Sequence, residues 1–187
     1  MTKREEHIVE AAMRLFIRYG VKRTGMHDIA AEAGISRQTL YNAFSNKDAV
    51  LQATIRLLAD RVAASVEAGL KNAAGLGDQL DVIFKHIAIE HFDLLHTSPN
   101  AEDIVAGFNA SSQEELEAGA RRNIEIIGRI LEPYATEIEK NGLTVAQYAD
   151  FIQRSATAAK YNAKSKKHLL ALLAALRVAT LKVTGGA

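Results

Sequence analysis

The chain has 187 residues, 48% of them hydrophobic and 24% charged, which is the balance of a globular protein and excludes a disordered one. Cysteine is absent, which excludes disulfide bonds and thiolate metal sites and fits a reducing cytosol. The net charge of +1 says little by itself, but residues 151–187 carry seven basic and no acidic side chains.

The start of the chain is charged and is followed by no apolar core of a signal peptide, so no secretory signal is expected. The longest apolar run, residues 169–176, is far shorter than the roughly 20 residues that cross a bilayer. These features predict a cytoplasmic protein with no membrane partner.

The sequence predicts an all-α fold of about nine helices, because proline is rare and no segment shows period-two alternation. Thr2 and Glu5 form a capping box for a first helix over 3–19, which Gly20 ends. Two short helices follow, over 26–33 and 36–44, with a turn at Gly34 and a cap at Ser36.

The remaining pattern predicts longer helices. They are expected over 47–71, 78–96 and 101–109, then from 111 or 112 to a break at Pro133, and finally over 144–163 and 165–183. Thr144 with Gln147 forms a further capping box, and Ser165 caps the last helix.

Two short helices joined by a glycine turn and supported by a preceding helix are typical of the helix-turn-helix motif. Leu40 and Phe44 face inward on the third helix, and the polar side chains face outward. Arginine can bind guanine edges, glutamine can bind adenine, and a threonine methyl can contact thymine. The sequence therefore predicts a DNA-recognition helix.

The segments 28–36 (DIAAEAGIS) and 39–51 (TLYNAFSNKDAVL) resemble the TetR family of transcriptional regulators. The match covers about residues 5–55, and its parts occur in order at the family's spacing. The resemblance implies a three-helix DNA-binding domain over 1–46, followed by a helical dimerisation and effector-binding domain over 47–187.

The resemblance also assigns roles to single residues. Base-edge contacts are expected from Arg37, Gln38 and Thr39, and phosphate contacts from Ser36, Tyr41 and Lys47, with Thr24 and His27 helping at the start of the second helix. The sequence departs from the family pattern at two positions. Gly25 stands where Thr or Ser is usual, so only its backbone N–H could contact DNA, and Asn42 stands where His is common but can still donate to phosphate.

The resemblance implies that the last two helices pair with those of a second subunit, so a homodimer is expected. The small residues 155–159 allow close helix approach, and the last helix is apolar over a wide arc, which agrees with a buried interface. The basic C-terminal segment could form ion pairs with the acidic middle of the chain; a solvated helix face is the simpler interpretation.

The resemblance further implies a pocket for an unknown small-molecule effector. On the helix over 78–96, His91 falls on the apolar stripe, where it is either a hydrogen-bonded core histidine or a group that orients a ligand. His86 and Glu90 lie four residues apart, but with no third ligand no metal site is predicted. The predicted lining residues are Phe84, Ile87, His91, Phe108, Asn123, Tyr134, Tyr148 and Phe151.

These features predict a repressor that a small molecule releases from a palindromic double-stranded DNA operator. One alternative is a dimeric DNA-binding protein that responds to no effector. The other is a small helical enzyme, which is disfavoured because the sequence has no nucleophile–base spacing and no phosphate-binding glycine loop. No cofactor is predicted.

Overall fold

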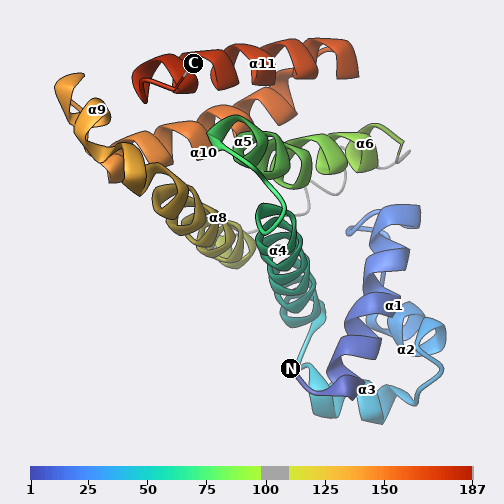
Figure 1. Ribbon diagram of the computed structural model, residues 1–187. Coiled ribbons are helices and arrows are strands. Elements are labelled where there is room, and N and C mark those ends of the chain that lie inside the picture. The colour runs from blue at the N-terminus through green and yellow to red at the C-terminus, as the bar shows by residue number, and fades with distance from the viewer. Residues whose placement is uncertain (98–109, 187) are drawn as a thin grey trace. The chain divides into compact units, whose positions relative to one another are not determined.

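The computed structural model describes residues 1–97 and 110–186, and these residues form helices and turns without a β-strand (Figure 1). The all-α prediction is therefore confirmed. With α5 and α6 counted as one interrupted helix, the described residues hold nine α-helices, close to the expected number. The helix expected over 101–109 lies outside the described residues, and α9 was not expected as a separate helix. No helix within the described ranges is long and apolar enough to cross a membrane.

The chain forms two compact units. Of the described residues, the head unit contains 1–61, 95–97 and 110–119, and the body unit contains 62–94 and 120–186. Two long helices, α4 and α8, contribute residues to both units.

Helix α1 (Lys3–Tyr19) begins with the predicted capping box. The Thr2 hydroxyl accepts the Glu5 N–H at 3.2 Å, and the Glu5 carboxylate accepts the Thr2 N–H at 2.7 Å. The bond from the Thr2 N–H stabilises the ionised carboxylate and lowers the pKa of Glu5. Gly20 ends the helix in a left-handed conformation, with φ of 85°.

Helices α2 (Met26–Glu32) and α3 (Arg37–Ala43) are short, as the sequence predicts. Ile29 of α2 and Leu40 of α3 are fully buried, and they form one apolar core with Ile8 and Phe16 of α1. Such short helices are unstable alone, so burial of this shared core is what holds them in place.

Helix α4 (Lys47–Leu70) begins with Asn46, whose side-chain carbonyl accepts the Ala49 N–H at 2.8 Å. Within the head unit, Val50, Leu51 and Ile55 of α4 pack into the core of α1 to α3. Leu116 of α8 packs against the same core, and Arg56 of α4 forms an ion pair with Glu115.

The helix predicted over 78–96 starts earlier and is interrupted. Helix α5 (Leu76–Phe84) begins at Leu76, which is buried and anchors the first turn. A π-helical turn (Lys85–Ile89) follows and leads into α6 (Glu90–Thr97). This turn adds one residue to the helix repeat, so Phe92 takes the fully buried position that a regular helix would give to His91. Leu94 is exposed for the same reason.

Helix α8 (Ala110–Leu131) ends two residues before Pro133, in agreement with the predicted break. A 3₁₀ turn (Glu132–Tyr134) carries the proline, whose missing N–H and fixed φ suit the start of a turn. Helix α9 (Ala135–Lys140) follows, and Gly142, two residues beyond its end, has φ of 75°.

Helices α10 (Val145–Asn162) and α11 (Lys166–Val183) pack side by side in the body unit (Figure 1). Their predicted N-caps are confirmed, because the Thr144 hydroxyl accepts the Gln147 N–H and the Ser165 hydroxyl accepts the His168 N–H. Between the two helices, the buried Tyr148 hydroxyl donates to Thr180 at 3.3 Å.

Acidic residues of the middle of the chain pair with the basic C-terminal segment. Lys166 of α11 lies 2.6 Å from Asp93 of α6, and Arg177 of α11 lies 3.1 Å from Asp81 of α5. These two contacts lie within one chain, so the interpretation of the basic segment as a merely solvated face is incomplete.

Candidate nucleic-acid interface

Helix α3 turns an uninterrupted polar face to solvent. Arg37, Gln38, Tyr41 and Asn42 are exposed, with Tyr41 at 51%, while Leu40 on the opposite side is fully buried. The burial of Leu40 fixes the rotation of α3 about its axis, so these four side chains point to solvent. This is the geometry that a helix needs to enter a major groove.

Ser36 caps α3. Its hydroxyl accepts the Thr39 N–H at 3.1 Å and lies 2.9 Å from the Thr39 hydroxyl. Thr39 is half-buried, so it presents less of its surface than the other predicted base readers. The cap leaves the first N–H groups of α3 open to a phosphate.

The outward side chains already bond to one another. Arg37 Nε donates to Nδ1 of the exposed His27 at 3.2 Å, and Gln38 Nε2 donates to the Asn42 side-chain carbonyl at 2.9 Å. Both bonds are exposed and cost little to exchange, so these donors remain available to base edges. The structure thus brings the predicted His27 beside the predicted Arg37.

Thr24 and Gly25 are placed differently. Thr24 is 3% exposed, and its hydroxyl donates to the Gly20 carbonyl at 2.8 Å. The Gly25 N–H donates to the Asp28 carboxylate at 2.8 Å and so caps α2. Both groups hold the turn before α2, and their assignment to DNA remains a prediction from the resemblance.

Lys47 is half-buried, and its ammonium group donates to the Val21 carbonyl at 2.9 Å. This bond ties the first turn of α4 to the segment that follows α1. Its predicted phosphate contact is untested, and the lysine has this second, structural bond.

Sequence reasoning missed two residues that position the recognition helix. The His7 ring bonds to the Ala33 carbonyl at 3.0 Å, and Arg14 forms an ion pair with Glu32 at 2.7 Å. The first contact joins α1 to the turn after α2, and the second joins α1 to the last residue of α2. No local sequence signal marks them, because each partner lies about 20 residues or more away.

The predicted effector-lining residues are scattered over the body unit. Phe84 and Ile87 are buried in its core, His91, Asn123 and Tyr134 are half-buried, and Phe151 is 53% exposed. Tyr148 is buried and stacks on Phe151, with ring centroids 5.9 Å apart. Phe108 lies outside the described residues. Their role in binding an effector stays a prediction.

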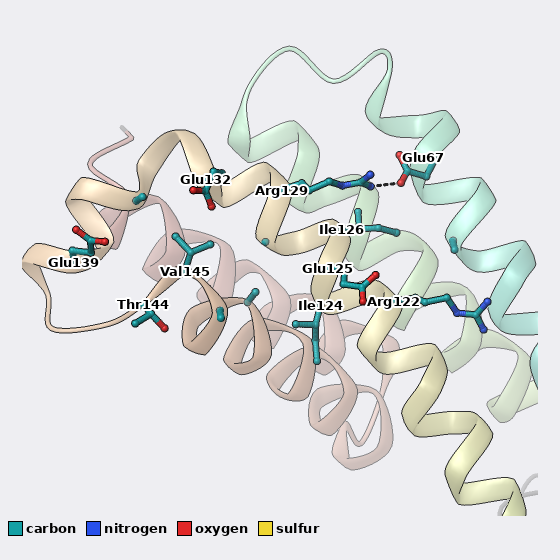
Figure 2. A pocket seen from close by; sticks show the side chains of 15 residues that line it. Glu67, Arg122, Ile124, Glu125, Ile126, Arg129, Glu132, Glu139, Thr144 and Val145 are labelled. Carbon is teal, nitrogen blue, oxygen red and sulfur yellow. Dashed lines mark hydrogen bonds and ion pairs between the residues drawn. The ribbon is translucent and has the colours of Figure 1, made fainter.

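The body unit has a cavity of about 880 Å³ that none of these residues lines. Charged side chains of α8 surround it, and Figure 2 shows Arg129 directed at Glu67 of α4, with which it forms an ion pair. The cavity reaches Glu139 and the first turn of α10. The sequence signal for this cavity is a charged stripe that runs along α8 into the turn after it: Arg122, Glu125, Arg129 and Glu132.

His86 lies 2.9 Å from Glu90, which agrees with a surface pair. Among the described residues, no three His, Asp or Glu side chains are grouped so that they could hold a metal ion.

A three-helix core that presents one polar helix, joined in sequence to a larger helical body, defines an all-helical helix-turn-helix protein. The sequence profile described as "Bacterial regulatory proteins, tetR family" matches residues 8–54. Residues 8–54 are therefore similar to the N-terminal segment of TetR-family regulators.

Known proteins extend this likeness. The chain is 26% identical over 148 residues to YuxN of Bacillus subtilis, an uncharacterized helix-turn-helix transcriptional regulator, with 74% of this chain and 50% of YuxN covered. The chain thus spans half the length of that relative. Among solved structures, reduced Escherichia coli NemR superposes with a TM-score of 0.69 at 19% identity, covering 93% of this chain and 96% of NemR.

A SmeT–triclosan complex superposes with a TM-score of 0.64 at 20% identity, covering 97% of this chain and 91% of SmeT. At these identities the structural likenesses establish the fold alone.

Proposed function

We propose that the protein is a dimeric transcriptional repressor that binds a palindromic operator and is released by a small-molecule effector. The observation that carries the proposal is the exposed polar face of α3, which is fixed in orientation by the buried Leu40. Arginine, glutamine and asparagine on this face match the donor and acceptor pattern of base edges.

Operator selection followed by binding measurements tests DNA recognition. Purified protein is expected to enrich palindromic sites from random duplex DNA. Arg37→Ala is expected to weaken binding to the selected site by about 1–3 kcal/mol and to relax preference at one position in each half-site. Lys140→Ala, which removes an exposed charge from α9, is the matched control and should bind like the wild type. Equal affinity for selected and random DNA would refute the proposal.

The response to an effector is supported by the body unit, which has the fold of the SmeT–triclosan complex and contains a cavity of its own. A ligand that prefers a conformation with wrongly spaced recognition helices lowers operator affinity, and a preference of about 1–3 kcal/mol is sufficient. Thermal shift against a metabolite panel, followed by operator release, tests this step.

The second candidate is a dimer that binds DNA without any effector. The two functions differ in one outcome: a compound that raises the melting temperature should also weaken operator binding if the first is correct. If stabilising compounds leave operator affinity unchanged, the second candidate is favoured.

A further inference from the structure

Helix α10 carries polar side chains on its inner face. Ala149, Gln153, Ala156 and Lys160 follow one another at intervals of four, three and four residues, which places them in one stripe along the helix. The first three are at most 5% exposed. Lys160 therefore lies on the face that the helix turns into the body unit, while Phe151 and Arg154 lie on an exposed side.

Gln153 lacks a hydrogen-bond partner on one end of its amide. Its Nε2 donates to Thr157 at 3.2 Å, whereas Oε1 is buried and has no partner in the described part of the protein. If the amide is turned round, the unpaired end becomes Nε2, so one polar atom is unsatisfied in either orientation. Buried polar atoms are almost always paired, and this exception calls for a missing partner.

Lys160 is a cation in the same stripe without a carboxylate partner among the residues that the structure describes. Its contact there is with the adjacent Tyr161, whose ring centroid lies 4.6 Å from Nζ. Burial lowers the pKa of Lys160 to about 8, so the ammonium form still predominates at neutral pH. A half-buried ammonium group of this kind is stabilised by any anion that reaches it.

His91 on α6 is the titratable group that faces Lys160 from a neighbouring helix. Its Nδ1 donates to the His86 carbonyl at 3.0 Å, which leaves Nε2 as the acceptor of the neutral ring. Burial, and next the charge of Lys160, lower the pKa of His91 and keep the ring neutral. The neutral histidine therefore cannot balance the charge of the lysine, but its Nε2 can accept a hydrogen bond from a ligand hydroxyl or amide.

We propose that Lys160 binds the carboxylate of an amphipathic effector, and that the unpaired amide of Gln153 binds a second polar group of the same molecule. Seven residues separate the two side chains, which corresponds to about 10 Å along the helix. The effector is thus an elongated weak acid that carries a polar group at each end. This inference rests on the proposed function, because it specifies the chemistry of the effector.

Isothermal titration calorimetry with three probes of one skeleton tests the charge preference: 4-phenylbutanoate, 4-phenylbutanamide and 4-phenylbutylamine. The full-length protein is expected to bind the carboxylate at least tenfold more tightly than the amide and to show no saturable binding of the amine. Sodium chloride and inorganic phosphate are titrated separately. Binding of these ions alone, with equal affinity for carboxylate and amide, would show that the site holds only a free anion and would overturn the proposal.

Three variants test whether Lys160 causes the preference for the carboxylate over the amide. Lys160→Met should reduce the carboxylate-to-amide ratio to less than threefold, and Lys160→Arg should keep it. Lys164→Met, which removes an exposed lysine just beyond the helix, should leave it unchanged. Circular dichroism confirms that each variant is folded, and Lys160→Gln replaces Lys160→Met if the latter is not.

An unchanged ratio in the folded Lys160 variant, or no binding of any probe, would refute the anion site. Operator affinity of the probe-free protein is measured on the same samples. If the probe-free protein does not bind the operator, the proposed function is refuted while the probe result stands, so the two failures are distinguishable.

Discussion

Lys47 illustrates how a side chain chosen for one role can also perform another. The sequence predicts a phosphate contact, and the structure shows its ammonium group bonded to the Val21 carbonyl. A hydrogen bond from a charged side chain contributes about 1.5–3 kcal/mol to stability when removal of the side chain leaves its partner unsatisfied. The partly exposed position of Lys47 reduces that contribution.

We therefore expect Lys47→Met to lower the free energy of unfolding by about 1 kcal/mol, in addition to weakening all DNA sequences alike. Urea denaturation measures the first effect, and the salt dependence of DNA binding measures the second. Lys71→Met, at an exposed position, is the control for loss of charge. If Lys47→Met is as stable as the wild type, the role of Lys47 is limited to DNA binding.

Lys160 makes stability depend on pH. Its pKa is about 8 in the folded protein and close to 10.4 in the unfolded chain. As the pH falls from 10.4 towards 8, the unfolded state takes up a proton first, so folding is progressively disfavoured; below pH 8 the penalty is complete. Stability contributed by the neutral lysine is therefore present at high pH and lost on acidification through this window.

The corresponding measurement compares the wild type with Lys160→Met at about pH 7.5 and about pH 9.5. The free energy of unfolding of the wild type should rise relative to the variant by about 1–2 kcal/mol over this interval. Tyr161 remains in both proteins, and His91 does not titrate in this interval because its pKa is lowered from its ordinary value. Parallel pH profiles would contradict the burial of this charge.

At the scale of helices, the capping residues allowed most boundaries to be predicted. The starts of α1, α10 and α11 follow from side chains within three residues of each cap, and the end of α8 follows from Pro133. The π turn could not be predicted, since no residue type specifies it. It moved Phe92 into the core and displaced His91, which the periodicity had placed there.

Gly34 and Gly128 form a matched pair for testing backbone conformation. A Cβ would meet no atom within 4 Å at either position, but Gly34 has φ of 64° in the turn before α3. Gly34→Ala should cost about 1–2 kcal/mol in unfolding free energy, because the left-handed region disfavours a Cβ. Gly128→Ala, inside α8, should instead stabilise by about 0.5–1 kcal/mol. Equal effects in thermal unfolding would show that the turn relaxes.

The predicted site residues divide according to the distance of their partners along the chain. The outward face of α3 could be predicted, because it depends on helix periodicity around Leu40. The buried position of Thr24 could not, because it depends on the turn that Gly20 makes after α1. The predicted effector-lining residues also rest on helix periodicity, but they belong to several helices. The periodicity of a helix does not determine how it packs against other helices.

At the scale of the whole molecule, the proposed dimer is supported by exposed apolar side chains of α10 and α11. Phe151, Leu170 and Val178 are 53%, 45% and 51% exposed. Exposed apolar side chains on two neighbouring helices are typical of an interface. Leu170→Glu and Phe151→Glu should each convert the dimer to a monomer in analytical ultracentrifugation and weaken operator binding. Tyr19→Glu, at an equally exposed position of α1, should remain dimeric.

The first residues of α8 have a consequence for protein engineering. Leu116 covers the apolar core of α1 to α3, and Glu115 pairs with Arg56, so the head is assembled from two stretches of sequence. A fragment that stops at residue 61 would leave this patch uncovered and should aggregate. Chimeric regulators that exchange DNA specificity between relatives therefore need to transplant the start of α8 together with the N-terminal helices.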